Sequence, residues 1–575
     1  MTVDILAADN LSRRFVVEGR SIQALDGVSF SIRQGCVTGL IGPDGAGKTT
    51  LMRLAAGLLV PDGGSIRVLG LDATRDALKV QAALGYMPQR FGLYEDLTVQ
   101  ENLDLYADLQ GVPMDQRAQR YQALTRMTAL AEFTNRLAGN LSGGMKQKLG
   151  LACTLVRAPS LLLLDEPTVG VDPVSRRELW AIIERLVKDE GMSVLLSTAY
   201  LDEAERCDDV VLMHEGRVLM QGNPSDLSAP MGGRTWAVRG GRLRDLQARL
   251  AGKPGVVDAQ VQGDHVRLVM RQDADASAQF SGLEGCSVEA VKPRFEDGYV
   301  DLLRSRAESR SHEGMTFSHP VTESVSPVIH VENLRRNFGD FWAVDGISFE
   351  VNRGEIFGLL GANGAGKSTT FRMLCGLLPA SSGSLRVTGL DLRHAASVAR
   401  ARIGYMSQKF SLYGNLSVMQ NLVFFASAYG LPKKLRGERI GWSLSEFELE
   451  KHADQLSGSL SLGYKQRLAM ACSLMHQPDI LFLDEPTSGV DPLARREFWQ
   501  RINALARSGV TVLITTHFME EAEYCDRIAI MAAGRILTLD EPAIIKAHAK
   551  TTDNPEPSME DAFIHLVEDA GREAA

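Results

Sequence analysis

Short runs of apolar residues, each followed by a glycine-rich or acidic turn, occur in two similar sets along this chain. Residues 36–41 and 356–360 precede glycine-rich loops, and two further apolar runs end in an Asp-Glu pair at residues 165–166 and 484–485. A short apolar run bounded by turn residues is typical of a strand buried in a sheet. The spacing between corresponding motifs is constant over most of each half, so the pattern predicts a duplicated α/β domain.

Between the two halves lies a segment with a different pattern. Residues 226–304 combine short β-like runs with one stretch of helical periodicity at 242–250, which predicts a small accessory α/β element. Residues 305–326 are rich in Ser, Glu and His and predict a flexible linker. The expected strands of the accessory element cover residues 235–238, 256–257, 266–270 and 287–291.

Each half ends in a related amphipathic segment. Residues 293–303 and 557–567 share the order Pro-x-x-Glu-Asp, followed by apolar positions at helical spacing. We expect both to form short helices that pack on their parent domains, with docking of a partner as the alternative. The predicted regions are a first domain at 1–225, the accessory element at 226–304, the linker at 305–326, a second domain at 327–545, and a C-terminal tail with a short helix at 546–575.

The composition is that of an ordinary globular protein with more than one core. The 575 residues are 45% hydrophobic and 23% charged, with a net charge of -9, which gives no general attraction to nucleic acid or anionic lipid. The seven cysteines show no metal-ligand or disulfide spacing, so we expect reduced thiols in a cytosolic protein. The N-terminus lacks the pattern of a signal peptide, and no uncharged apolar run is long enough to span a bilayer. We therefore expect any membrane role to depend on a partner.

The two glycine-rich loops have the spacing of a phosphate-binding loop. Between a strand and a helix, such a loop directs backbone N–H groups at phosphate oxygens, and the helix N-terminus adds positive potential. We expect Lys48 and Lys367 to reach the β- and γ-phosphates, and the hydroxyls of Thr49 and Ser368 to bind Mg²⁺. The full set of expected loop contacts is Gly42, Asp44, Gly45, Gly47, Lys48, Thr49 and Thr50 in the first loop and Gly361, Asn363, Gly364, Gly366, Lys367, Ser368 and Thr369 in the second.

The Asp-Glu pairs supply the remaining chemistry of a nucleotide hydrolase. The first carboxylate of each pair, Asp165 or Asp484, can support Mg²⁺, and the second, Glu166 or Glu485, can polarise the attacking water. Two carboxylates left unpaired at a buried strand end would be costly, which argues against a purely structural role. The sequence therefore predicts two nucleotide sites, each with a magnesium ion.

A third motif in each half identifies a family. Residues 141–147 read Leu-Ser-Gly-Gly-Met-Lys-Gln, and residues 460–466 read Leu-Ser-Leu-Gly-Tyr-Lys-Gln. Residues 456–459 imitate a fragment of this motif, but the later Lys-Gln pair sets the register at Leu460. Together with the loops and the Asp-Glu pairs, these motifs resemble the ATP-binding cassette (ABC) ATPases over nearly all of both halves.

This resemblance implies two P-loop nucleotide-binding domains of the α/β class in tandem, each with a helical subdomain, that hydrolyse ATP with Mg²⁺. It also implies further site residues. These are Gln89 and Gln408 as Q-loop glutamines near Mg²⁺ and the attacking water, Asp172 and Asp491 as D-loop residues, His517 as the switch histidine, Phe15 and Phe338 as adenine contacts (with core packing as the alternative), and Ser142, Gly143, Gly144, Ser461 and Gly463 as signature residues.

The two copies differ at positions that bear on catalysis. Ala199 stands opposite His517, Leu462 stands where the first copy has Gly143, and Asp44 stands where the second copy has Asn363. In ABC proteins, two cassettes pair head to tail, and each ATP lies between the phosphate loop of one cassette and the signature of the other. The lost histidine and the lost glycine then fall in one composite site. We therefore predict one fast hydrolytic site, formed by the second phosphate loop and the first signature, and one slow or mainly ATP-holding site.

Three classes of ABC protein compete for the function. A DNA-repair or chromosome ATPase would need an inserted coiled coil or zinc-binding cysteines, and the sequence has neither. A translation factor at the ribosome would join its cassettes by a long basic helical linker, whereas residues 226–325 hold nearly equal numbers of basic and acidic residues with β-like segments. The pattern favours the third class, the ATPase subunit of a transporter.

Among transporters, the chain most resembles the fused tandem ATPase subunit of bacterial ABC-2-type exporters, because it shares their accessory segment ending in a Pro-x-x-Glu-Asp helix. The resemblance implies two integral membrane permease subunits, pairing of the cassettes within one chain, no nucleic acid partner, and a position at the cytoplasmic face of the cell membrane. The segments after the Q-loop glutamines would receive the permeases, and Phe91, Phe410, Tyr94 and Tyr413 are candidate groove residues, with core packing as the alternative. Tandem-cassette sugar importers are the nearest alternative, but they lack the accessory element.

Overall fold

The computed structural model describes residues 4–17, 20–89, 92–283, 285–304, 327–392, 394, 399–408, 412–552 and 554–574. The predicted linker at 305–326 and the aromatic residues Phe91 and Phe410 lie outside the described residues. No helix in the described ranges is long and apolar enough to cross a membrane. The chain divides into two compact units: Met1–Met231 with Pro293–Tyr299 and Gly489–Pro492, and Gly232–Lys292 with Val300–Ser488 and Leu493–Ala575.

The larger sheet of the first cassette is parallel except for its antiparallel edge pair of β9 and β10. In spatial order it consists of β10 (Arg217–Gly222), β9 (Asp209–His214), β3 (Val37–Ile41), β8 (Ser193–Thr198), β7 (Leu161–Asp165) and β6 (Leu84–Met87). Strands β3, β7 and β8 are buried along their whole length, which is why they read as continuous apolar runs. The strand predicted at 36–41 is confirmed as β3.

The smaller sheet of this cassette is antiparallel. Its strands, in spatial order, are β2 (Arg20–Arg33), β1 (Asp4–Val17), β4 (Gly63–Val68) and β5 (Leu71–Asp72). Helix α1 (Lys48–Ala55) joins the two sheets, because its Leu51 shares one buried cluster with Leu6 of the smaller sheet and Leu163 of the larger one. Helix α2 (Ala77–Ala83) follows β5. The phosphate-binding loop thus leads into the centre of the core.

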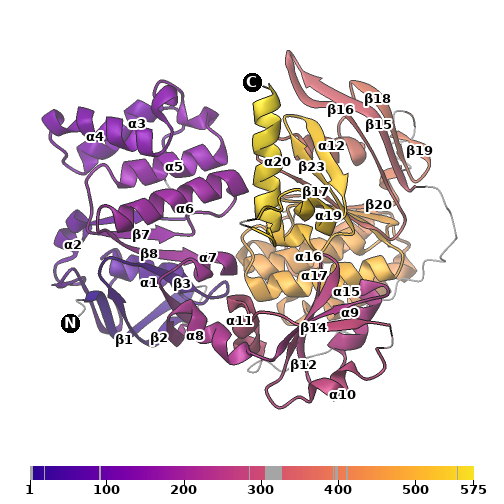
Figure 1. Ribbon diagram of the computed structural model, residues 1–575, viewed down its shortest axis with the longest axis horizontal. Helices are drawn as coiled ribbons and strands as arrows, with labels where there is room; N and C mark the ends of the chain where they lie inside the picture. Colours follow the sequence, from indigo (N-terminus) through magenta and orange to yellow (C-terminus); the bar gives the residue numbers. More distant parts are fainter. Residues whose placement is uncertain are drawn as a thin grey trace. The chain divides into compact units, whose positions relative to one another are not determined.

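The predicted helical subdomain is present. Figure 1 shows α3 (Val99–Leu109) and α4 (Met114–Met127) on the far side of α5 (Gly143–Thr154) from the strands β7 and β8. Thr98 and Glu101 form a capping box that fixes the start of α3. The other helical elements are η1 (Ala131–Phe133), η2 (Ala138–Asn140), α6 (Pro173–Lys188), α7 (Leu201–Glu205), α8 (Pro224–Ser228) and η3 (Ala229–Met231).

The second cassette repeats both sheets in the same spatial order, which confirms the duplication. Its larger sheet consists of β20 (Ile403–Met406), β21 (Ile480–Asp484), β22 (Thr511–Thr516), β17 (Ile356–Gly361), β23 (Arg527–Ala532) and β24 (Arg535–Asp540). Its smaller sheet consists of β16 (Phe341–Val351), β15 (Ile329–Phe338), β18 (Ser382–Val387) and β19 (Leu390–Asp391).

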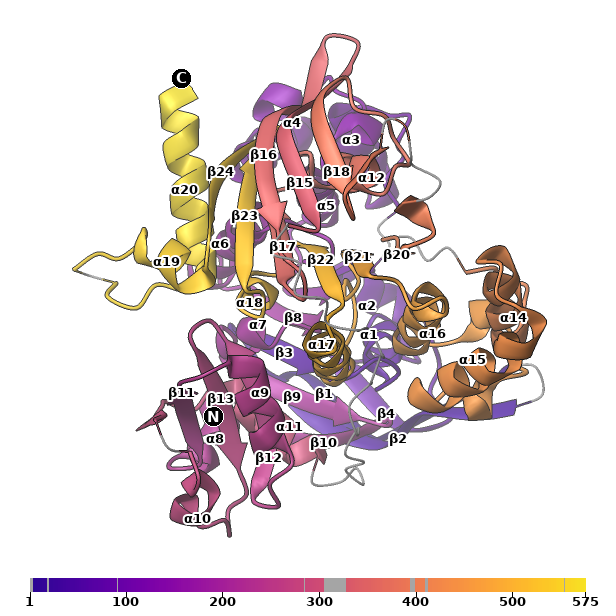
Figure 2. The same ribbon diagram turned by 90° about the vertical axis from the view of Figure 1, so that its right-hand side faces the viewer.

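The helices of the second cassette follow the same plan. Figure 2 shows α14 (Val418–Ala428) and α15 (Lys433–Glu446) at the outside, with α16 (Leu462–Leu474) between them and the strands β21 and β22. The remaining elements are α12 (Lys367–Leu374), η4 (Glu450–His452), η5 (Ser457–Ser459), α17 (Pro492–Arg507), α18 (Met519–Ala522), α19 (Pro542–Ala547) and α20 (Met559–Ala574).

The accessory element is a four-stranded antiparallel sheet with two helices. Along the chain it runs β11 (Thr235–Arg239), α9 (Leu243–Ala251), β12 (Val256–Gln262), β13 (His265–Met270), α10 (Ala276–Phe280) and β14 (Ser287–Ala290). The spatial order β12-β13-β11-β14 and the β-α-β-β-α-β succession are those of a ferredoxin-like fold. All four predicted strands and the predicted helix at 242–250 are confirmed.

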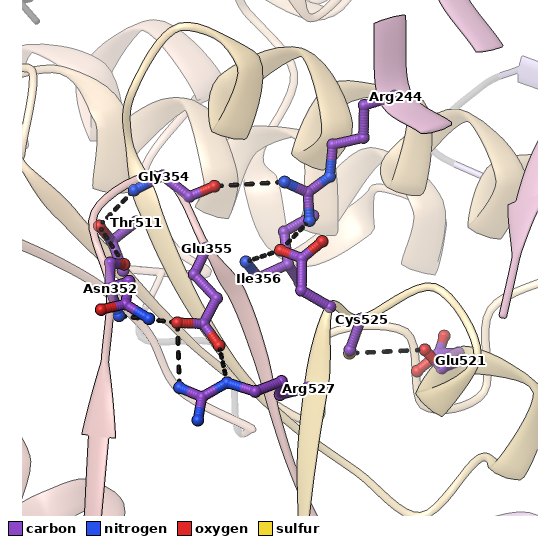
Figure 3. A network of polar contacts seen from close by, with 10 residues as sticks. Arg244, Asn352, Gly354, Glu355, Ile356, Thr511, Glu521, Cys525 and Arg527 are labelled. Carbon is purple, nitrogen blue, oxygen red and sulfur yellow. Dashed lines mark hydrogen bonds and ion pairs between the residues drawn. The ribbon is translucent and has the colours of Figure 1, made fainter. Parts of the chain in front are cut away.

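Polar contacts join the accessory element to the second cassette within one compact unit. Arg244 on α9 donates to the carbonyl of Gly354 at 3.2 Å and pairs with the carboxylate of Asp526 (Figure 3). The same carboxylate accepts a hydrogen bond of 2.8 Å from the N–H of Ile356, the first residue of β17. Because β17 leads directly into the second phosphate loop, Arg244 is anchored at the base of that loop's strand.

The most deeply buried charge of this contact is Asp258 on β12. Its side chain is 4% exposed and pairs with Arg496 of α17 and, at 2.9 Å, with Arg304 at the end of α11 (Phe295–Arg304). Burial lowers the pKa of Arg304 and of Arg496. The carboxylate of Asp258 therefore contributes to the compensation of both buried guanidinium charges.

Replacing Asp258 with alanine is expected to lower the free energy of unfolding by about 3–5 kcal/mol, because removing one partner of a buried ion pair leaves the other charge uncompensated. Urea unfolding of the full chain, followed by circular dichroism, measures the change. Asp264→Ala is the control, since Asp264 forms a solvent-exposed pair with Arg239 in the same element, and such pairs contribute about 0–1 kcal/mol. Equal losses in the two variants would contradict the structural role of Asp258.

The two amphipathic helices pack on their parent cassettes, as predicted. In α11, the N–H of Phe295 donates to Glu205 Oε1 at 2.7 Å, and Gly298 lies so close to Leu227 that a Cβ would come within 2.1 Å of its carbonyl oxygen. Helix α20 contacts α18, α19 and β24, and it lies alongside β24 in Figure 2. The apolar face of each helix therefore packs against its parent cassette.

Candidate nucleotide sites

Each glycine-rich loop ends in a left-handed glycine that caps a helix. Gly47 and Gly366 both have a φ of 100°, and a Cβ at these positions would lie 2.5 Å from the carbonyl oxygen of Ala24 and 2.4 Å from that of Ala343. Only glycine tolerates this conformation so close to a neighbouring backbone. Helices α1 and α12 begin at the next residue, so the free N–H groups of their first turns lie at the loop and can bind phosphate.

The predicted phosphate-binding lysines are buried and held by loop carbonyls. Lys48 Nζ donates to the Gly42 carbonyl at 2.7 Å, and Lys367 Nζ donates to the Gly361 carbonyl at 2.7 Å. An ammonium group in this position can exchange a carbonyl partner for a charged phosphate oxygen, which forms the stronger hydrogen bond. The other predicted loop residues lie in the same loops or in the first turns of α1 and α12: Asp44, Gly45, Thr49, Thr50, Asn363, Gly364, Ser368 and Thr369.

The first acidic residue of each Asp-Glu pair ends a central strand and accepts a hydrogen bond from the neighbouring strand. Ser197 Oγ donates to Asp165 Oδ1 at 2.7 Å, and Thr515 Oγ1 donates to Asp484 Oδ1 at 2.6 Å. In the first cassette, Thr49 Oγ1 also donates to Asp165 Oδ1 at 3.3 Å. The structure thus brings two of the predicted magnesium ligands together.

These residues fit a magnesium ion. Asp165 Oδ2 is buried and has no hydrogen-bond partner among the described residues, so one carboxylate oxygen remains for a cation. In the part of the chain that the structure describes, no three Cys, His, Asp or Glu side chains form a cluster that could hold a metal ion. Because Mg²⁺ is usually held by one or two protein groups together with substrate phosphates, Thr49 with Asp165, and Ser368 with Asp484, would hold it beside a bound nucleotide.

The second acidic residue of each pair has a strained backbone and faces the Q-loop. Glu166 has a φ of 52° and Glu485 a φ of 46°, a left-handed conformation that costs about 1–3 kcal/mol for a residue with a side chain. Gln89 Nε2 donates to Glu166 Oε2, and Gln408 Nε2 donates to Glu485 Oε2 at 2.6 Å. Each cassette therefore holds its predicted catalytic glutamate and its Q-loop glutamine in direct contact.

The two glutamates differ in one neighbour. His517 Nδ1 lies 3.2 Å from Glu485 Oε2, whereas the first cassette has the small, buried Ala199 at the matched position. Burial opposes ionisation of Glu485, but the hydrogen bond and the charge of His517 outweigh it and lower the pKa of this carboxyl. In the first cassette, burial raises the pKa of Glu166. The carboxylate that would polarise the water is therefore more firmly ionised in the second cassette.

The structure places the second signature in the predicted register. Ser461 is the N-cap of α16, as Ser142 is the N-cap of α5, and residues 456–459 instead run into the short helix η5, which corresponds to η2. Ser142 Oγ accepts a hydrogen bond of 3.3 Å from the N–H of Met145. Both signature serines therefore stand at the beginning of a helix, where free N–H groups can face an anion.

The two signature helices differ in their first turn. Helix α5 begins at Gly143 and α16 begins at Leu462, so a leucine side chain replaces a hydrogen atom next to the N-cap. Gly144 lies tightly against α6, since a Cβ there would come within 2.3 Å of Ser175 Oγ, whereas a Cβ at Gly463 would be 3.5 Å from its nearest neighbour. Because Gly143 has no side chain, a ligand can approach the backbone at the start of α5 more closely than the backbone at Leu462 of α16.

Comparison with known proteins identifies the family. The family described as "ABC transporter" matches residues 25–169 and 344–488, one block in each cassette. The chain belongs to the ABC transporter family. It is 51% identical over 573 residues to the "Probable multidrug ABC transporter ATP-binding protein YbhF" of Escherichia coli (strain K12), in an alignment that covers 99% of each chain. As a member of this family, the chain is an ATPase and the ATP-binding subunit of an ABC transporter.

Other relatives match single cassettes. The "Nod factor export ATP-binding protein I" of Ralstonia nicotianae (strain ATCC BAA-1114 / GMI1000) is 42% identical over 224 residues, which cover 39% of this chain and 70% of that protein. The solved structure of an ATP-binding subunit of an ABC transporter aligns with a TM-score of 0.38 and 28% sequence identity, over 42% of this chain and 99% of that one.

Asp44 distinguishes the phosphate loop of the first ABC cassette. Burial is the largest cause that raises the pKa of Asp44 to about 6. Above this pH the side chain is mostly ionised and adds a negative charge to the loop that holds Lys48. The second ABC cassette has the neutral Asn363 at this position.

We expect Asp44→Asn to tighten ATP binding at the first ABC cassette by about fivefold, because two like charges about 4 Å apart repel by about 1 kcal/mol even in water. Equilibrium binding in a Lys367→Ala background, which weakens the second site, measures the effect near neutral pH. The Asn363→Asp variant in the second loop, measured in a Lys48→Ala background that weakens the first site, is the reciprocal control and should weaken binding there. The difference in affinity between the unsubstituted first loop and the Asp44→Asn loop should vanish as the pH falls below about 6. An equal affinity at all pH values would rule out the repulsion.

The predicted adenine contacts lie on the first hairpin of each ABC cassette. Phe338 is 48% exposed, pairs across the hairpin with Phe341, and has the guanidinium group of Arg336 4.7 Å from its ring centroid. Phe15 is partly buried, with the guanidinium group of Arg13 5.0 Å from its ring. The exposed ring of Phe338 is available for stacking on a base, which favours the adenine role over core packing there.

Sequence reasoning missed the groups that hold these loops together. Ser197 and Thr515 donate to the carboxylates that are predicted to bind magnesium, and Glu203 and Glu521 are buried carboxylates that accept from the threonines ending the two motifs. All four occupy matched positions in the aligned segments 197–205 and 515–523. That repeat equivalence was the available signal, but an acidic residue in a short helix normally indicates a solvated face.

Proposed function

We propose that this chain is the tandem ATPase subunit of an ABC-2-type exporter that energises two separate permease subunits at the cytoplasmic face of the cell membrane. The observation that carries the proposal is the 51% identity, over 99% of both chains, with the Escherichia coli protein named as a probable multidrug ABC transporter ATP-binding protein. Identity at this level extends over both cassettes and the accessory element. It therefore supports a common type of transport, with export of drug-like compounds as the proposed direction and cargo.

An exposed aromatic surface on the second cassette supports docking of a permease. Tyr413 is 45% exposed, and its ring centroid lies 4.6 Å from that of Phe424, which is 41% exposed on α14. The adjacent Val423 is 45% exposed. In the first cassette, Tyr94 is 56% exposed at the position matched to Tyr413. Large apolar side chains gathered at the surface after a Q-loop are suited to burial against a partner.

We propose that the two cassettes pair head to tail within one chain. One composite site then combines the second phosphate loop, Glu485 and His517 with the first signature. The other combines the first phosphate loop, Glu166 and Ala199 with the second signature, which carries Leu462. Pairing within one chain is favoured because the covalent connection holds the second cassette at a high effective concentration.

In the proposed hydrolytic site, the groups of the second cassette divide the chemistry among them. Glu485 is ionised and accepts the proton of the attacking water, while Gln408 holds its Oε2 in place. Lys367 neutralises charge that develops on the γ-phosphate. His517 Nε2 is buried and has no hydrogen-bond partner among the described residues, so in the imidazolium form it can donate to a phosphate oxygen while Nδ1 donates to Glu485. When bound, Mg²⁺ supplies further neutralisation at the β- and γ-phosphates.

ATP binding would close the two cassettes, and hydrolysis would reopen them. The Q-loop links these two events, because Gln408 contacts Glu485 directly and the exposed Tyr413 follows it by a few residues. A change at the γ-phosphate would therefore move the surface that the permease occupies.

An affinity pull-down of the tagged chain from detergent-solubilised native membranes tests the proposal. Mass spectrometry should identify polytopic membrane proteins in the eluate, and their sequences would show whether they are of the ABC-2 type. The Tyr413→Asp, Phe424→Asp double variant should lose these partners, whereas Phe341→Asp, at an exposed aromatic position on the first hairpin of the same cassette, should keep them. Recovery of ribosomes without membrane proteins would overturn the transporter proposal in favour of a translation factor.

A further inference from the structure

A fully buried carboxylate joins two catalytic loops in the second cassette. Glu521 on α18 is 0% exposed and accepts hydrogen bonds from two threonine hydroxyls, Thr516 Oγ1 at 2.7 Å and Thr487 Oγ1. Thr487 ends the motif that contains Glu485, and Thr516 directly precedes His517. One carboxylate therefore connects the loop of the proposed general base with the loop of the switch histidine.

The hydroxyl of Thr516 also fixes the backbone of the switch loop. While Thr516 Oγ1 donates to Glu521, it accepts a hydrogen bond of 2.9 Å from the N–H of Phe518. A hydroxyl can serve both roles at once because it has one proton and two lone pairs. The residue between these two anchored positions is His517, so its backbone is held on both sides.

Ring contacts hold the side chain of His517 as well. Its imidazole is stacked on the ring of Phe518, with 4.4 Å between centroids, and the guanidinium group of Arg495 lies 4.5 Å from the centroid of that phenyl ring. Arg495 is in turn 3.9 Å from the carboxylate of Glu521. The carboxylate of Glu521 therefore contacts two groups that hold His517 in place. One is Thr516, the neighbour of His517 in the chain, and the other is Arg495, which lies against the ring of Phe518.

We propose that Glu521 is a positioning residue for ATP hydrolysis, which keeps His517 and Glu485 at the separation that their contact requires. This inference rests on the proposed role of the second cassette as the hydrolytic one. Burying a carboxylate is costly unless its hydrogen bonds are satisfied, and the bonds that satisfy this one come from the two loops that carry the catalytic pair.

The first cassette contains a similar arrangement without the histidine, in which both threonine hydroxyls donate to the same carboxylate oxygen, Oε2. Glu203 is 1% exposed and accepts hydrogen bonds from Thr198 Oγ1 at 2.6 Å and Thr168 Oγ1 at 3.1 Å. Thr198 Oγ1 accepts from the N–H of Tyr200 at 3.0 Å, and the residue between them is Ala199. The local packing is matched, but there is no imidazole to position, so Glu203 is a natural control for a purely structural role.

The test compares Glu521→Gln with Glu203→Gln in the full chain. Glutamine keeps the size of the side chain but loses the charge and one of the two acceptor oxygens. We expect Glu521→Gln to lower kcat for ATP by about tenfold or more with little change in KM, because a small misplacement of a catalytic group is costly. Glu203→Gln should leave kcat nearly unchanged, and the melting temperature of each variant measures any loss of stability separately. Equal effects of the two variants on kcat would overturn the inference.

The pH–rate profile supplies a readout that a structural role would not move. The groups that face Glu485 are Asp484, Lys367, Gln408 and His517, and of these His517 makes the largest contribution that lowers its pKa. If Glu521→Gln displaces the imidazole, the acid limb of kcat should shift to higher pH; an unshifted limb would contradict the inference. Thr516→Ser, which keeps the hydroxyl, should retain the rate that Thr516→Val loses. Two further variants separate the positioning role of Glu521 from the hydrolytic role of the second cassette. If His517→Ala and Glu485→Gln left kcat unchanged, the proposed hydrolytic site itself would be wrong.

Discussion

Glu485→Gln is expected to lower the steady-state rate of ATP hydrolysis by about 10²–10⁴-fold, whereas Glu166→Gln is expected to lower it by less than about twofold. The two effects differ because the contribution of a general base is lost only at the site where hydrolysis occurs. Glu485 has a lowered pKa and contacts His517, while Glu166 has a raised pKa and its cassette has Ala199 at the position matched to His517. The two residues share their backbone strain and their glutamine partner. The difference between them therefore isolates the effect of the switch histidine and the opposite signature.

Phosphate release at saturating ATP and Mg²⁺ measures both variants. ATP binding should be retained in each, since neither carboxylate holds the phosphate chain in the proposed mechanism. Equal losses in the two variants would contradict the asymmetry, and a larger loss in Glu166→Gln would reverse the assignment of the two sites.

The second large effect concerns His517. Replacing this residue with alanine is expected to lower kcat by about 10²–10³-fold, the usual cost of removing one positioned donor to a transition state. The loss has two parts, because Nε2 no longer reaches the phosphate and Glu485 loses the partner that lowers its pKa. The pKa of Glu485 should therefore rise, so the acid limb of the pH–rate profile of the residual activity should move to higher pH.

A second partly buried histidine of the same cassette provides the control. His476 Nε2 donates to the Ile403 carbonyl at 3.1 Å, the ring stacks on Tyr429, and burial lowers the pKa of this imidazole to about 4. His476→Gln should leave kcat within about twofold, since it removes no interaction made in the transition state. A loss of rate in His476→Gln as large as that in His517→Ala would mean that the cassette is sensitive to any buried histidine, which would contradict the specific role of His517.

Much of the site could be predicted because its chemistry is local in the sequence. The phosphate loops, the Asp-Glu pairs and the signature serines each combine a short apolar run with residues of fixed function, and the duplicated pattern sets their register. The accessory strands followed from their apolar periodicity in the same way. The sequence alignment of the two copies also showed that Ala199 stands where the second copy has His517.

Other features have no local signal. Asp258 and Arg496 lie on the accessory element and on α17, far apart in the sequence, and their pairing depends on how those elements pack. The left-handed backbone of Glu485 is imposed by the turn after β21 and contradicts the preference of the residue type. The proposed positioning role of Glu521 belongs to the same category, because the local sequence around a buried glutamate in a short helix does not differ from that around a solvated one. Domain boundaries and residue roles at the sites remain predictions.

The central claim, that hydrolysis occurs mainly in the second cassette, is tested most directly by locating a trapped product. Orthovanadate holds ADP in a site that has just hydrolysed ATP, so a photoreactive azido-ATP can label that site during turnover and mass spectrometry can identify the labelled peptide. We predict that the label appears on peptides of the second cassette, near Phe338 and the loop of Lys367. Equal labelling of the two cassettes, or labelling near Phe15 alone, would contradict the account.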